Sequence, residues 1–149
     1  MTQEEIIQVL QDALKSELAA VEMYAAHAKV IPEAAVAEGV RAILEVEQEH
    51  AANLSRRIRE LGGKPVQPGG PATVAGRVAG AASQAMSTVD MLRLELGEEQ
   101  MAIKHYAMAV AEIMDDDDTV SMLSEHLQDE IAHATWMKRQ IGALGTAQR

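Results

Sequence analysis

Two Glu-x-x-His motifs are the residues most able to do chemistry in this sequence, Glu47 with His50 and Glu130 with His133. Residues three apart on a helix lie on the same side, so each motif presents a carboxylate and an imidazole together. Such a pair offers oxygen and nitrogen ligands to a metal ion. One four-residue motif is weak evidence, so the interpretation depends on what accompanies it.

An internal repeat accompanies the two motifs. The segments ELAAVEMY (17–24) and EQMAIKHY (99–106) share the pattern E-x-x-A-[VI]-x-x-Y and contain the two tyrosines of the chain. Glu17 precedes Glu47 by 30 residues, and Glu99 precedes Glu130 by 31. The repeat predicts two helix pairs related by a pseudo-twofold axis. Each pair would supply one Glu from its first helix and one Glu-x-x-His from its second.

Apolar residues at steps of three and four predict the helices that position these groups. Helix-breaking segments separate them, namely Pro32, Gly62-Gly63 and DDDD at 115–118. We expect four long helices, at about 2–31, 33–61, 87–114 and 119–143, with a linker at 62–72 and a short helix or covering segment at 73–86. The fold class is therefore all-α: a four-helix bundle with one long crossover connection between the second and third long helices, the ferritin-like arrangement.

Each predicted apolar stripe carries one glutamate near its middle, and Glu45 and Glu49 fall on the opposite side of their helix from Glu47. Burying four unpaired carboxylates would be prohibitive, because each costs several kcal/mol. Two divalent cations would neutralise the four charges. Oxygen-rich sites with one imidazole per metal suit iron, with manganese possible. The pattern thus predicts a dinuclear metal site.

Composition limits the partners and the location that this protein is expected to have. The chain has 149 residues, which we treat as a single domain (1–149), and it has no cysteine. A net charge of −10 argues against a nucleic-acid partner. Its longest uncharged stretches are too short for an integral membrane segment, and its N-terminus lacks the features of a signal peptide. We therefore expect a cytoplasmic protein.

The sequence resembles the ferritin-like superfamily, specifically the bacterioferritin and rubrerythrin group, along nearly its whole length. The segments that carry this resemblance are SELAAVEMYAAHAK, EVEQEHAANL, LRLELGEEQMAI and DEIAHATWM. The resemblance implies a site of two iron ions that react with oxygen or peroxide, and subunits that form a homodimer or a larger homo-oligomer. The ligands that it implies are Glu17, Glu47, His50, Glu99, Glu130 and His133.

Three details of the implied site are open to test. The helix-three ligand is Glu99 by the repeat spacing, with Glu95 as the alternative. We expect Glu47 and Glu130 to bridge the metals, with Glu17 and Glu99 terminal. Tyr24 resembles the tyrosine that lies next to the metal ligands in these proteins. We assign it a catalytic role, because its hydroxyl can reach back toward the metals.

Departures from the family bear on the reaction. The chain lacks the cysteines of the rubredoxin-type iron centre, and Gln48 stands where bacterioferritin has its haem-ligand methionine, so we expect no haem. The leading hypothesis is a non-haem diiron protein that oxidises Fe(II) with oxygen or peroxide, in iron handling or protection from oxidative stress. One alternative is a diiron hydroxylase of a small or lipid substrate, resembling demethoxyubiquinone hydroxylase, with a channel covered by 73–86. The other is a metal-binding bundle without turnover.

Overall fold

The computed structural model describes residues 1–147, and these form five α-helices and no strand. The all-α prediction is therefore confirmed. The helices are α1 (Gln3–Val30), α2 (Ala34–Glu60), α3 (Pro71–Ser83), α4 (Thr88–Glu112) and α5 (Asp117–Ala147). The first four agree with the expected segments to within a few residues, whereas α5 continues past its predicted end at residue 143.

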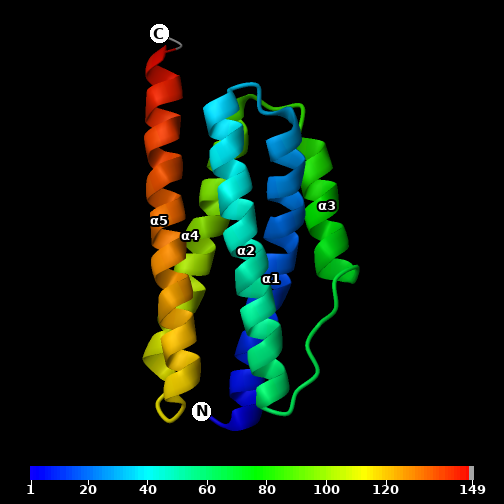
Figure 1. The fold of residues 1–149 in the computed structure, drawn as a ribbon, viewed down its shortest axis with the longest axis vertical. Coiled ribbons are helices and arrows are strands. Elements are labelled where there is room, and N and C mark those ends of the chain that lie inside the picture. Colours follow the sequence, from blue (N-terminus) through cyan, green and yellow to red (C-terminus); the bar gives the residue numbers. More distant parts are fainter. Residues whose placement is uncertain (148–149) are drawn as a thin grey trace.

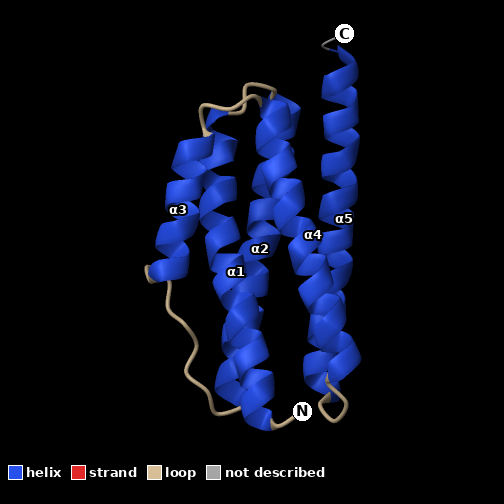
Figure 2. Ribbon diagram, turned by 180° about the vertical axis from the view of Figure 1, so that it is seen from behind, coloured by secondary structure: helices blue, strands red, loops and turns tan. Residues whose placement is uncertain are grey.

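The four long helices form two antiparallel hairpins, α1 with α2 and α4 with α5 (Figure 1). The segment between α2 and α4 runs from one end of the bundle to the other, and α3 forms part of it. This is the predicted crossover connection. At the top of Figure 2, α5 extends beyond the ends of the other helices.

Local sequence signals explain where the helices begin. Thr2 and Glu5 form a capping box at α1, in which the Thr2 hydroxyl accepts a hydrogen bond from the Glu5 amide at 3.1 Å. Within the predicted DDDD turn, Asp116 precedes α5 and accepts a hydrogen bond from the Thr119 amide at 3.1 Å. Arg57 of α2 contacts the same carboxylate oxygen, with its Nη2 2.8 Å from Asp116 Oδ1.

The short helix α3 packs on the outer side of α1, and small residues make this possible (Figure 1). A Cβ atom added to Gly76 would lie 2.3 Å from the carbonyl oxygen of Ala19, and one added to Gly80 would lie 2.9 Å from the side chain of Ala26. The backbones of α1 and α3 therefore approach each other more closely than larger side chains would allow.

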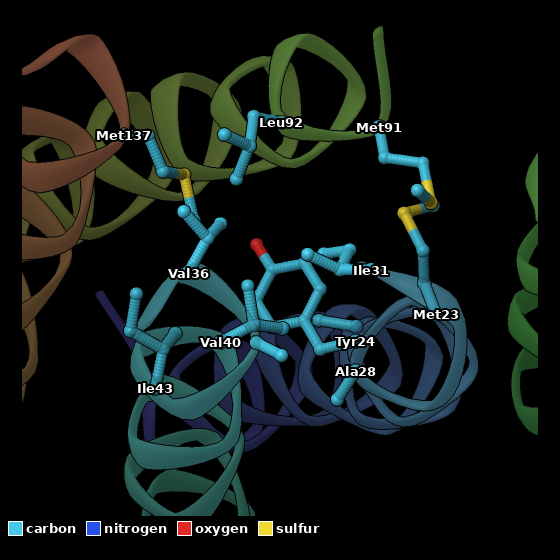
Figure 3. Close-up of a cluster of buried hydrophobic side chains, with 12 residues drawn as sticks. Met23, Tyr24, Ala28, Ile31, Val36, Val40, Ile43, Met91, Leu92 and Met137 are labelled. Atoms are coloured by element: carbon cyan, nitrogen blue, oxygen red, sulfur yellow. The ribbon is translucent and has the colours of Figure 1, made fainter. Parts of the chain in front are cut away.

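Two apolar clusters fill the core, and the polar residues lie between them along the helices. One cluster contains Leu10 and Leu14 of α1, and the other contains Tyr24, Ala28 and their neighbours (Figure 3). Glu17 lies between these two groups on α1, and the motifs on α2 and α5 lie between the same clusters. Among the described residues, no helix is long and apolar enough to span a bilayer.

Candidate metal centre

The six residues predicted to bind metal come together in the middle of the bundle. Four helices contribute to this cluster, and each of its side chains is buried: Glu17, Glu47, His50, Glu99, Glu130 and His133. The outward positions of Glu45 and Glu49 are also as predicted, because both are exposed. The apolar clusters on either side shield these residues from bulk solvent, so their polar atoms depend mainly on one another or on a bound ion.

The cluster consists of two overlapping groups that could each hold a metal ion. One group is Glu17, Glu47, His50 and Glu130; the other is Glu47, Glu99, Glu130 and His133. In each group the four ligand atoms lie within 4.8 Å of one another. Glu47 and Glu130 belong to both groups, which is the arrangement that two bridging carboxylates would have.

The two histidines each turn Nδ1 toward the carboxylates. His50 Nδ1 lies 3.1 Å from Glu130 Oε1 and 3.4 Å from oxygens of Glu17 and Glu47. His133 Nδ1 lies 3.3 Å from Glu47 Oε1 and 3.5 Å from Glu99 Oε1. Donor atoms at right angles around a metal with bonds of about 2.1 Å are separated by about 3 Å. The separations in the cluster fit donors that share an ion.

Most of these ligand atoms lack any hydrogen-bond partner within the part of the chain that the structure describes. They include both carboxylate oxygens of Glu47, one oxygen each of Glu99 and Glu130, and Nδ1 of both histidines. Native proteins leave few buried polar atoms unsatisfied, because each costs about 1–3 kcal/mol. Six such atoms facing one another are what a pair of divalent cations would satisfy, so the donor set fits two ions of the kind that carboxylates and imidazoles bind.

The pKa values of the cluster also indicate a site that needs cations. Burial raises the pKa of Glu47 well above its usual value, and the neighbouring Glu17 carboxylate raises it further. Burial, together with the neighbouring carboxylates, raises the pKa of Glu130 to about 10. Burial opposes a charge on His50, but the carboxylates of Glu130, Glu17 and Glu47, each within 3.4 Å of its Nδ1, outweigh this and raise its pKa. Without cations, therefore, the cluster retains protons that bound metal would displace.

Each tyrosine of the repeat donates a hydrogen bond to the glutamate of the other repeat. The Tyr24 hydroxyl lies 2.8 Å from Glu99 Oε1, and the Tyr106 hydroxyl lies 2.7 Å from Glu17 Oε1. In Figure 3 the Tyr24 hydroxyl points from α1 toward α4. Burial and the adjacent carboxylates raise the pKa of both hydroxyls well above the usual value, so both stay protonated and act as donors.

Asp129, which the sequence did not identify, orients His50. Its Nε2 lies 2.8 Å from Asp129 Oδ2, which fixes Nε2–H as the donor and leaves Nδ1 free for a metal. His126 stacks on His50 with ring centroids 3.9 Å apart, and its Nδ1 lies 3.2 Å from the Tyr106 hydroxyl. Asp129 directly precedes Glu130 in the sequence, but nothing in the periodicity indicates its contact with α2.

Glu95, the alternative helix-three ligand, lies outside both groups. It is fully buried, and its Oε2 lies 2.5 Å from His27 Nδ1. The other ring nitrogen of His27 lies 2.6 Å from the Ser83 hydroxyl of α3. The predicted apolar stripe of this helix passed through Leu96, which is only half-buried, so the stripe placed Glu99 correctly and missed the burial of Glu95.

With this geometry established, comparison with known families is informative. The profile of the Ferritin family, described as the ferritin-like domain, matches residues 7–146. The chain belongs to this family. A comparison with curated protein sequences gives no match to this ferritin-like chain.

Solved structures resemble the ferritin-like chain along nearly its full length. A dodecameric thioferritin, the bacterioferritin-related protein of Bacteroides fragilis, has a TM-score of 0.85 at 21% identity, covering 99% of this chain and 90% of its own. A ferritin-like diiron-carboxylate protein of Bacillus anthracis has a TM-score of 0.79 at 24% identity, and the match covers 95% of this chain and 99% of that protein. Rhodobacter capsulatus bacterioferritin has a TM-score of 0.76 at 25% identity, and the match covers 96% of this chain and 87% of that protein. Its structure has a metal-free dinuclear site and haem iron.

Proposed function

We propose that this ferritin-like chain binds two iron ions in the six-residue cluster and oxidises Fe(II) with oxygen or peroxide. The observation that carries the proposal is the set of six buried atoms, from five of the six cluster residues, that have no hydrogen-bond partner among the described residues. Two adjacent iron ions can together pass two electrons to one oxygen or peroxide molecule by each becoming ferric, whereas a single ferrous ion would have to reach a high-energy oxidation state to do so.

Each residue of the cluster would have a distinct role in holding the two ions. Glu17 and His50 would hold one ion, Glu99 and His133 the other, and Glu47 and Glu130 would bridge them, in line with the two overlapping groups. The hydrogen bonds from Tyr106 and Tyr24 would hold Glu17 and Glu99 in place. Of the two, we assign Tyr24 the catalytic role, as a hydrogen-bond donor or a source of a further electron. Asp129 would keep the His50 ring in its metal-binding orientation.

The space beside the cluster favours small reactants over a lipid substrate. The hollow that reaches Glu17 has a volume of about 40 Å³, room for about three waters at 10–15 Å³ each. Pockets for drug-sized molecules are typically about 300 Å³ or larger, so such a molecule would not fit in the part of the hollow that reaches Glu17, although a wider outer part of about 280 Å³ adjoins it. The hollow lies between α1 and α4, bordered by residues 9–17 of α1, whereas α3 packs against α1 farther along, at Ala19 and Ala26. The predicted substrate channel under 73–86 therefore does not describe this opening.

Anaerobic loading with Fe(II), followed by oxygen or peroxide, tests the proposal. Ferric absorbance should grow with added iron and saturate at two irons per chain. Glu47→Gln should reduce the stoichiometry, whereas the exposed Glu45→Gln, two residues away, should leave it unchanged. One metal per chain, or a loaded protein inert to both oxidants, would contradict the oxidase and favour a metal-binding bundle without turnover.

Two further parts of the proposal concern assembly and haem. The thioferritin of Bacteroides fragilis is a dodecamer. By analogy we propose a homodimer or larger homo-oligomer for this chain, which light scattering would measure. Gln48 is exposed on α2. Protein made with abundant haem should show no Soret band, because an amide is a poor haem ligand.

A further inference from the structure

A hollow between α1 and α4 leads from the surface to the metal cluster. Its inner part, about 40 Å³, is bordered by Ala13 and Glu17 of α1 and by Tyr106 and Ala109 of α4. Its outer part, about 280 Å³, shares Ala13 and Ala109 with the inner part. The two parts therefore form one opening that ends at a carboxylate of the cluster.

The internal repeat shows that this opening is a specific feature of one half of the bundle. Positions in the second repeat follow their mates by 82 residues, as Glu99 follows Glu17, so Ala13 corresponds to Glu95 and Ala109 corresponds to His27. Glu95 and His27 are a fully buried pair, 2.5 Å apart, and fill the space that the two alanines leave open.

Larger apolar side chains complete the closure of the second half. By the same offset, Val9 and His105 at the opening correspond to Met91 and Met23. Both methionines are buried, and Figure 3 shows their side chains meeting between α1 and α4. The open side thus has two alanines and an exposed histidine at positions where the closed side has a buried His–Glu pair and two methionines.

The rim of the opening favours a cation. Asp12 and Glu112 are exposed and border the outer part together with His105 and Met108. Carboxylates at the mouth of an apolar cleft raise the local concentration of cations, an effect that salt screens. The net charge of −10 on the chain as a whole also attracts cations.

We propose that Fe(II) reaches the cluster through this opening and that Glu17 is the first protein ligand it meets. The inference rests on the proposed function. The inner hollow holds too few waters for a fully hydrated ion, so the ion must exchange waters for the Glu17 carboxylate there. The position held by Glu17 and His50 therefore fills first, and the position held by Glu99 and His133 fills through it.

Anaerobic binding of Co(II) alone tests the route without any turnover. Its visible absorption, followed in a stopped-flow instrument, reports the rate of binding, and titration reports the stoichiometry. Ala13→Leu should slow binding about tenfold or more while two ions per chain still bind at equilibrium. The matched control is Ala107→Leu, an exposed α4 position away from the opening, which should bind at the unaltered rate. Equal rates for both variants would overturn the proposal.

A second variant keeps the test decisive if Ala13→Leu fails to fold. Asp12→Asn combined with Glu112→Gln changes only exposed groups, and it should slow Co(II) association and weaken its dependence on salt. An unchanged rate and salt dependence in this double variant would contradict the route. Failure of the unmodified protein to bind two Co(II) ions would instead contradict the proposed function, so the two failures are distinguishable.

Discussion

Glu95 and Glu99 lie one turn apart on α4, and we predict that their removal has opposite consequences. Glu95→Ala should keep two metals per chain and lose stability, because it deprives the buried His27 of its partner. Glu99→Ala should lose metal and remain close to normal stability when metal-free, because it removes a carboxylate whose Oε2 has no partner among the described residues.

The magnitudes follow from burial. Both side chains of the His27–Glu95 pair are 0% exposed, and removing one partner of such a pair costs about 3–5 kcal/mol. For a chain of this size each kcal/mol lowers Tm by about 2–4 °C, so Tm should fall by about 6–20 °C. In Glu99→Ala the Tyr24 hydroxyl loses its acceptor, which costs about 1–3 kcal/mol, but relief of repulsion in the cluster offsets much of this.

Two measurements decide the question. Elemental analysis after metal loading gives the stoichiometry, and thermal unfolding in chelator gives the stability of the metal-free protein. The isosteric Glu95→Gln serves as a control, because its amide oxygen can still accept a hydrogen bond from His27. Loss of metal from Glu95→Ala with full metal content in Glu99→Ala would refute the reasoning and make Glu95 the ligand.

Three further predictions concern α3, the start of α5 and the empty cluster. Gly76→Val should lower Tm and increase amide exchange in α3, because the added side chain would collide with the Ala19 backbone. The half-buried Gly70 before the helix should tolerate the same change, because a Cβ atom there would lie no closer than 3.7 Å to its nearest neighbour, the Gln67 carbonyl oxygen. Asp116→Ala should lower the free energy of unfolding, measured in urea, by about 1–2 kcal/mol, because the Thr119 amide loses its hydrogen-bond acceptor. Asp118→Ala is the control, and an equal loss of stability in both variants would contradict the assignment of Asp116 as the cap. Burial raises the pKa of Glu130 from 4.5 to about 10, so the metal-free protein should lose stability as pH rises between these two values, where the unfolded chain has released a proton that the folded chain keeps. Bound metal should remove this slope, and a flat profile in chelator would contradict the prediction.

The sequence alone determined the helices and the residues that converge in the bundle. Period-3.6 patterning and caps such as Thr2 act locally, so the helix boundaries could be predicted from neighbouring residues. The cluster could be predicted because helical geometry places Glu47 beside His50, and because the repeat relates Glu17 to Glu99. A carboxylate at the middle of an apolar stripe must be buried, and this consequence needs no tertiary information.

Only the tertiary structure decided which side chains meet across helices. The pairing of His27 with Glu95, the contact of Asp129 with His50 and the stacking of His126 depend on helix rotation and separation, to which single-helix periodicity is insensitive. The same applies to the opening beside Glu17. The repeat predicts two equivalent halves, but whether alanines leave a hollow or a buried pair fills it depends on how closely two helices pack, a distance that no local pattern encodes.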